Sequence, residues 1–167
     1  MIFPHEELGS GQRAFQIVQQ DFKKIGIGIS LKVLNDPAAW QAIIADDYRS
    51  FDLAFWDWDL SIDPDFILSF MTCDSWDVWN DSGYCNKEYD RLYSEQQMTT
   101  SPAERLQIIY RMQDMIYEQT PYIILTYDDN RMAWSPKWTG FVPSPLGEFS
   151  SLSKQSLLGA HQVSGAG

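Results

Sequence analysis

The order of secondary structure predicted for residues 10–56 is the feature that most limits the fold. A helix is expected over 10–24, where apolar residues recur at spacings of three and four. From 27 to 33, apolar residues alternate with small or polar ones, as in a half-buried strand. A second helix is expected where Asp36 acts as a cap before a first-turn proline, and a second strand over 51–56. This order predicts an α/β fold with a small, mostly parallel sheet and flanking helices.

The rest of the chain is predicted to be mostly helical. Helices are expected over 63–71, after a cap at Asn86, and over 101–119, where Ser101-Pro102-Ala103-Glu104 forms a capping box. The apolar run 122–127 is typical of a buried strand, and from Pro136 the frequent prolines and glycines predict loop. In the helix over 101–119, the residues expected to be buried are Leu106, Ile109, Met112 and Ile116.

Aromatic and acidic side chains gather where the second predicted strand ends. In open parallel sheets, ligands bind outside the carboxyl ends of the strands. A carboxylate beside a tryptophan can pair with an ammonium group while the ring covers an apolar part of the ligand. The sequence therefore predicts a ligand-binding edge made of Trp56, Asp57, Trp58 and Asp59.

The composition of the chain limits the kinds of partner that it can bind. A chain of 167 residues has the size of one domain, and its 44% hydrophobic content is that of a globular protein. The formal net charge of −11 argues against a nucleic-acid partner, because phosphate binding needs clustered lysine and arginine. An acidic surface suits cationic or zwitterionic ligands, but it is equally a device for solubility. No apolar run reaches the roughly 20 residues of a membrane span, and the first residues lack the pattern of a signal peptide.

The sequence offers little for catalysis or metal binding. The two histidines, His5 and His161, lie near the ends of the chain, and no nucleophile or phosphate-binding motif is present. The acidic clusters lack the ligand rhythm of an EF-hand, so neither a metal nor another cofactor is expected. The alternative to a binding protein is a carbohydrate-binding or glycoside-hydrolysing domain that uses paired carboxylates beside tryptophan platforms. Its candidate carboxylates are Asp57, Asp59, Asp63 and Asp65.

Cys73 and Cys85 flank an aromatic and acidic loop. A zinc site would lack ligands, because no histidine or third cysteine lies nearby. A disulfide that closes the loop is favoured and would indicate a location outside the cytosol, with two unpaired buried thiols as the alternative.

Four segments in this order resemble the C-terminal half of the family 5 extracellular solute-binding proteins, the peptide-binding subunits of ABC importers. The resemblance runs from about Arg13 to Gly147. The segments are QRAFQIVQQDFKKIGIGISLKVL, FDLAFWDWDLSIDPDFIL, CDSWDVWNDSGYCNKEYDRLYSEQ and TSPAERLQIIYRMQDMIYEQTPYIILTY.

The resemblance implies one lobe of a periplasmic-binding-protein-like (class II) fold, excised from a longer two-lobe protein. The lobe is expected over 1–147, followed by a C-terminal extension over 148–167 that is at least partly disordered. Asp59 corresponds to the aspartate that pairs with the α-amino group of a bound peptide, and Trp56 begins the same motif. Cys73 and Cys85 correspond to the disulfide of dipeptide-binding relatives.

The function implied by the resemblance is capture of an oligopeptide or dipeptide between two lobes, without enzymatic activity. The expected partners are a peptide or other small solute and the permease subunits of an ABC transporter, and the protein is expected to be a monomer. The expected location is extracytoplasmic, in the periplasm or on the outer face of the membrane, where a lipid anchor would hold it. An oligosaccharide or a chelated metal is the rival ligand within the family, since the fold does not determine the solute.

Overall fold

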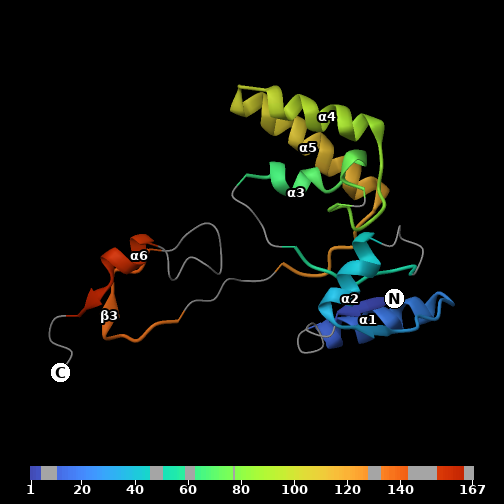
Figure 1. Cartoon of the computed structure of the whole chain (residues 1–167), viewed down its shortest axis with the longest axis horizontal. Helices are drawn as coiled ribbons and strands as arrows, with labels where there is room; N and C mark the ends of the chain where they lie inside the picture. Colours follow the sequence, from blue (N-terminus) through green and yellow to red (C-terminus); the bar gives the residue numbers. More distant parts are fainter. Residues whose placement is uncertain are drawn as a thin grey trace. The chain divides into compact units, whose positions relative to one another are not determined.

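The computed structural model describes residues 1–4, 11–45, 51–58, 63–76, 78–127, 133–142 and 154–163 (Figure 1). They belong to two compact units. The first unit spans 1–58 and 65–125, and the second unit spans 59–64 and 126–167.

The first unit contains a small parallel sheet, as predicted. β1 (Ile2–Pro4) pairs in parallel with β2 (Lys32–Leu34), so that Ile2 is opposite Lys32. The extended segment 51–58 joins β1 through a parallel bridge between Ile2 and Ala54. The backbone N–H of Ile2 donates to the carbonyl of Leu53 (2.8 Å), and that of Phe55 donates to the carbonyl of Ile2 (2.9 Å). The segment that ends in the predicted ligand edge is therefore held by the sheet.

Helix α1 (Gly11–Lys24) packs on β1 through aromatic rings. Phe3 contacts Phe15 edge to face, with ring centroids 5.9 Å apart, and stacks on Phe55 at 4.9 Å. Gly11 makes this approach possible, because a Cβ there would lie 2.9 Å from the Phe55 ring. The helix stops at Gly26, whose φ of 84° lies in the left-handed region. The helix predicted over 10–24 is confirmed.

The strand predicted over 27–33 is mostly wrong. β2 is only three residues long, and three of the four side chains expected to face inward are exposed, while Ile29 is half-buried. A half-buried strand needs a layer packed closely against its apolar face, whereas α1 leaves a small pocket beside Leu31. The exposed side chains are Ile27, Leu31 and Val33, together with Ile25 at the end of α1.

Helix α2 (Asp36–Trp40) continues into the π-helical turn η2 (Gln41–Ala45). Its cap is Asn35 rather than the predicted Asp36. Asn35 has the extended backbone that a cap requires, and its side chain accepts a hydrogen bond from the backbone N–H of Ala38 at 3.0 Å. The helix packs against β1, and the two form an apolar cluster. The buried residues of this cluster are Ile2, Ala39, Ala42, Ile43 and Ile44.

The helical part of the first unit contains α3 (Asp65–Ser69), η3 (Cys73–Ser75), α4 (Lys87–Met98) and α5 (Pro102–Gln119). α4 and α5 lie side by side (Figure 1). Both predicted caps are confirmed. The Asn86 side chain accepts from the backbone N–H of Glu88 at 2.9 Å, and the Ser101 hydroxyl accepts from that of Glu104 at 3.4 Å.

A second apolar cluster holds these helices together. Within it, the Tyr89 hydroxyl donates to the carbonyl of Leu68 at 2.9 Å, which ties α4 to α3. Leu106 was predicted to be buried but is 43% exposed. At about 100° per residue it lies roughly 120° around the helix from Met112, and Ile108 takes the inward position instead. The buried residues of this cluster are Leu68, Phe70, Met71, Tyr89, Leu92, Ile108, Ile109 and Met112.

The buried strand predicted over 122–127 is wrong. The segment pairs with no other strand among the described residues, and Ile123 and Ile124 are 65% and 61% exposed. An apolar run becomes a buried strand only where neighbouring elements cover both of its faces, and the described residues supply no such neighbours.

The second unit contains a short antiparallel pair, β3 (Trp138–Thr139) and β4 (His161–Gln162), and helix α6 (Lys154–Gly159). The loop predicted from Pro136 onward is thus interrupted by β3, and 148–167 includes α6 and β4. Ser156 is fully buried, and its hydroxyl lies 3.0 Å from both the backbone nitrogen and the carbonyl oxygen of Val142. The boundary at 147 remains a prediction.

Candidate functional site

The predicted ligand edge begins where the segment 51–58 leaves β1. Trp56 and Trp58 are half-buried, and Asp57 between them is exposed. This alternation follows from the extended backbone, because successive side chains of a strand point to opposite faces. Asp59 lies outside the described residues. The structure therefore describes three of the four residues of the predicted edge and leaves their role in binding a prediction.

Trp58 is held in place by a buried carboxylate. Its indole N–H donates to Asp81 Oδ2 at 2.7 Å, and the Tyr122 hydroxyl donates to Asp81 Oδ1. Asp81 lies in the loop between the cysteines and is 6% exposed. Since a buried carboxylate without partners is costly, these two donors make the burial of Asp81 tolerable. The contact joins three segments that are far apart in the sequence.

Burial changes the acidity of the Asp81 carboxyl group and of the Tyr122 hydroxyl group. Removal from water raises the pKa of Asp81 above its ordinary value, although the bonds from Tyr122 and Trp58 act in the opposite direction. Burial, and then the nearby Asp81 carboxylate, also raise the pKa of the Tyr122 hydroxyl. Tyr122 thus stays protonated and remains a donor to Asp81 at physiological pH.

Asp81 is expected to give the folded chain a pH-dependent loss of stability. Because its pKa is higher in the folded than in the unfolded state, its contribution is fully present below about pH 4, the ordinary carboxyl value. The contribution falls as the pH rises through the folded-state pKa. Urea denaturation across pH 4–8 should show the Asp81→Asn variant gaining stability relative to wild type as the pH rises. Parallel pH profiles for the two proteins would show that Asp81 ionises equally well in both states.

A tryptophan cluster (Trp40, Trp56, Trp58 and Trp79) surrounds the end of the segment 51–58. The ring centroids of Trp58 lie 6.1, 6.2 and 6.3 Å from those of Trp40, Trp56 and Trp79, all near edge to face. Trp58 also packs on Phe70 at 4.4 Å. The Trp56 indole N–H is buried and has no hydrogen-bond partner among the described residues, whereas that of Trp58 is bonded to Asp81. Trp58 is therefore the anchored member of the cluster.

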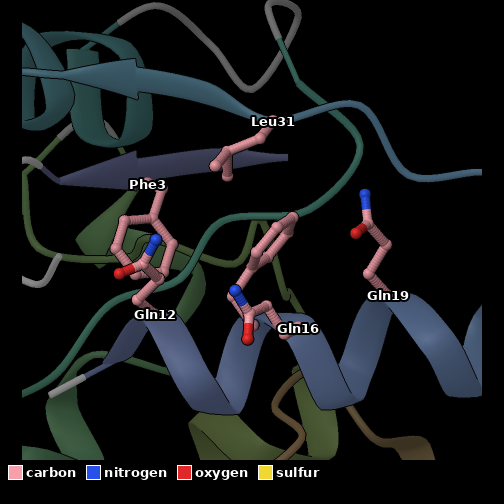
Figure 2. A pocket seen from close by; sticks show the side chains of 6 residues that line it. Phe3, Gln12, Gln16, Gln19 and Leu31 are labelled. Atoms are coloured by element: carbon pink, nitrogen blue, oxygen red, sulfur yellow. The ribbon is translucent and has the colours of Figure 1, made fainter.

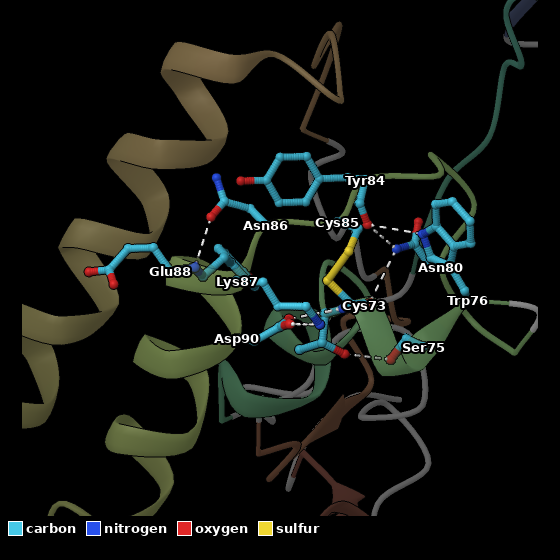
Figure 3. Close-up of a disulfide and its surroundings, with 12 residues drawn as sticks. Cys73, Ser75, Trp76, Asn80, Tyr84, Cys85, Asn86, Lys87, Glu88 and Asp90 are labelled. Carbon is cyan, nitrogen blue, oxygen red and sulfur yellow. Dashed lines mark hydrogen bonds and ion pairs between the residues drawn. A yellow bond between two sulfur atoms is a disulfide. The ribbon is translucent and has the colours of Figure 1, made fainter.

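The loop between Cys73 and Cys85 is closed by a disulfide, as predicted (Figure 3). Asp90 of α4 accepts a hydrogen bond from the backbone N–H of Cys73 at 2.9 Å. Inside the loop, the fully buried side chain of Asn80 donates to the carbonyls of Thr72 (3.3 Å) and Tyr84 (2.7 Å). The disulfide and these bonds together keep the backbone next to Asp81 in one conformation.

A small pocket of about 160 Å³ lies between α1 and the sheet (Figure 2), and no residue of the tryptophan cluster lines it. Aromatic and aliphatic side chains form one part of its lining and glutamines of α1 form the other. Gln19 is already bonded to the carbonyl of Ile29 at 2.9 Å. The predicted ligand residues do not line this pocket. Its lining residues are Phe3, Gln12, Phe15, Gln16, Gln19 and Leu31.

Within the described residues, no group of three or more histidine, cysteine or acidic side chains is arranged to hold a metal ion. None of the described helices combines the length and the apolar character needed to cross a membrane.

The sequence interpretation did not identify the supporting residues of this site. Trp58 and Asp81 lie 23 residues apart in the sequence, and Asp81 and Tyr122 lie 41 residues apart. No local pattern indicates these contacts. Trp40 and Trp79 lie on separate elements, and no local pattern predicts that their rings meet. The disulfide is the one signal that could have indicated them, because it implies an ordered loop.

No family model matches the chain. Curated proteins that are similar to it over most of its length include the following two. Di/tripeptide-binding protein 4 of Pseudomonas aeruginosa is 25% identical over 134 residues, which are 80% of this chain and 25% of that protein. Glutathione-binding protein GsiB of Escherichia coli is 25% identical over 147 residues, 84% of this chain and 29% of that protein. The chain thus spans between a quarter and a third of the length of these relatives.

Solved structures share the fold. The ABC transporter substrate-binding protein CtaP of Listeria monocytogenes superposes with a TM-score of 0.77 and 19% identity over 96% of this chain and 32% of that one. Helicobacter pylori DppA, in complex with the peptide STSA, superposes with a TM-score of 0.66 and 20% identity over 96% of this chain and 30% of that one. Campylobacter jejuni NikZ, in complex with Ni(L-His), superposes with a TM-score of 0.59 and 22% identity over 72% of this chain and 24% of that one. The predicted fold class, one lobe of a periplasmic binding protein, is confirmed.

Proposed function

We propose that this chain is one lobe of a family 5 extracellular solute-binding protein, a two-lobe protein that captures peptides for an ABC permease. The observation that carries the proposal is its similarity, over four-fifths of the chain, to proteins named for binding di/tripeptides and glutathione. The lobe occupies 1–147, and 148–167 is a C-terminal extension. The ligand is enclosed when the lobes close about a hinge, without covalent chemistry and without a resident metal or cofactor.

The ligand-facing edge is Trp56, Asp57, Trp58 and Asp59. Asp59 pairs with the α-amino group of the peptide, and the neighbouring tryptophans exclude water from that pair. Such an exclusion matters, because an exposed ion pair contributes only about 0–1 kcal/mol. The hydrogen bond from Trp58 to Asp81 supports this role, since a fixed ring costs little entropy when a ligand binds.

The partners are a peptide and the permease subunits, and the intact protein is a monomer outside the cytoplasm, held by a lipid anchor where no outer membrane retains it. The disulfide supports this location, because such bonds persist in oxidising compartments. A chelated metal is the second candidate ligand, favoured by the likeness to the solved complex of NikZ with Ni(L-His). The relatives reported above give no support to a carbohydrate enzyme.

Calorimetric titration of the two-lobe protein and of this chain alone, with the same di- and tripeptides, tests the proposal. The two-lobe protein should bind with micromolar or better affinity. This chain should bind at least about 100-fold more weakly, because half of the enclosing contacts are missing and only the enclosed site desolvates the ligand.

A micromolar peptide complex of this chain alone would contradict the half-site arrangement. If the two-lobe protein binds Ni(L-His) but no peptide, the ligand is a chelated metal and the proposed peptide ligand is wrong. Hydrolysis of a glycoside that is lost in the Asp59→Asn variant would overturn the transport function itself.

A further inference from the structure

Trp79 combines two properties that core residues rarely share. Its ring packs against Trp40 (centroids 5.7 Å apart), Trp58 (6.3 Å) and Phe70 (6.2 Å, nearly parallel). Even so, 43% of the residue is exposed in the first unit. Trp79 is therefore packed against the tryptophan cluster and partly exposed at the same time.

The backbone that carries Trp79 is unusually restrained for a loop. The backbone N–H groups of Trp79 and Asn80 both donate to the carbonyl of Ser75, at 3.0 and 2.9 Å. The following residue, Asp81, is bonded to Trp58 and Tyr122. The disulfide that closes the loop restrains this backbone further. A rigid aromatic surface of this kind binds with little loss of conformational entropy.

Trp79 offers a largely apolar indole ring. Asp81 is the buried carboxylate next to the cluster, and both of its oxygens already accept hydrogen bonds from Trp58 and Tyr122. It is thus engaged with protein donors and does not offer a free charge to a ligand side chain. Trp58 of the cluster directly precedes Asp59, the proposed partner of the peptide amino terminus, in the sequence.

We propose that Trp79, together with Trp40 and Trp58, forms a subsite for a large apolar or aromatic side chain near the amino terminus of the bound peptide. This subsite rests on the proposed peptide-binding function. It makes the protein selective for such peptides rather than tolerant of every side chain. Trp79 is the specificity-determining residue, because it is the most exposed of the three rings.

Calorimetry on the two-lobe protein tests the subsite with the tripeptides Ala-Ala-Ala, Phe-Ala-Ala, Ala-Phe-Ala and Lys-Ala-Ala. One phenylalanine peptide should bind about tenfold more tightly than Ala-Ala-Ala, as expected for burial of an aromatic side chain. Trp79→Ala should reduce this ratio to nearly one while changing the affinity for Ala-Ala-Ala less than about twofold. Trp79→Phe should restore part of the ratio.

Trp76→Ala is the matched control, because Trp76 lies on the same loop with a similar exposure of 41%. It should leave the ratio unchanged. An equal loss of affinity for all peptides in Trp79→Ala, an unchanged ratio, or tighter binding of Lys-Ala-Ala than of both phenylalanine peptides would overturn the subsite alone. Absence of any peptide binding by the wild-type protein would overturn the proposed function and the subsite with it.

Discussion

Loss of the Cys73–Cys85 disulfide is expected to lower the free energy of unfolding of the chain by about 3 kcal/mol. The bond closes a loop with a sequence separation of 12 residues, and its removal returns conformational entropy to the unfolded chain. The loop carries Asp81, which is bonded to both Trp58 and Tyr122, so the loss should propagate into the ligand edge. Urea denaturation of wild type and of the Cys73→Ser/Cys85→Ser double variant measures the difference.

Two controls make this comparison decisive. Reductant should destabilise wild type by the same amount and leave the double variant unchanged. Intact mass with and without reductant verifies that the bond is present in the starting material. A difference below about 1 kcal/mol would mean that the hydrogen bonds of Asn80 and Asp90 hold the loop without the disulfide.

Local signals in the sequence predicted the helices well. The caps at Asn86 and Ser101 depend on residues two or three positions apart, and the stop at Gly26 depends on one residue. Such features carry their own physical cause, because a cap satisfies backbone donors whatever the rest of the fold does. The cap of α2 was misplaced by a single residue, since Asn35 and Asp36 are both good capping residues.

Burial was predicted less well, because it depends on neighbours that hydrophobicity alone does not identify. Ile123 and Ile124 are as apolar as any core strand, yet they are exposed in the described part of the chain. Leu106 fits a helical apolar spacing only approximately, and the better-aligned Ile108 replaces it.

The candidate site shows the same division. The ligand edge predicted over 56–59 rests on residue types at the end of a strand, a local pattern, and stays a prediction. The bonds that fix it, from Trp58 and Tyr122 to Asp81, connect residues brought together only by the tertiary fold. No periodicity in the chain reports such contacts.

We propose that Asp59 binds the amino terminus of a peptide. Calorimetry with free and N-acetylated forms of the same peptide on the two-lobe protein tests this role directly. Acetylation removes the charge of the α-amino group, and Asp59→Asn removes the charge that would meet it. Each change should weaken binding on the order of 10- to 100-fold, as expected for a charge-assisted hydrogen bond shielded from water.

The matched control is Asp52→Asn, an exposed carboxylate of the same segment, which should leave the affinity unchanged. In the Asp59→Asn variant, acetylation should cost little more, because the two groups act on one interaction. Equal affinity of wild type for the free and the acetylated peptide would contradict the account.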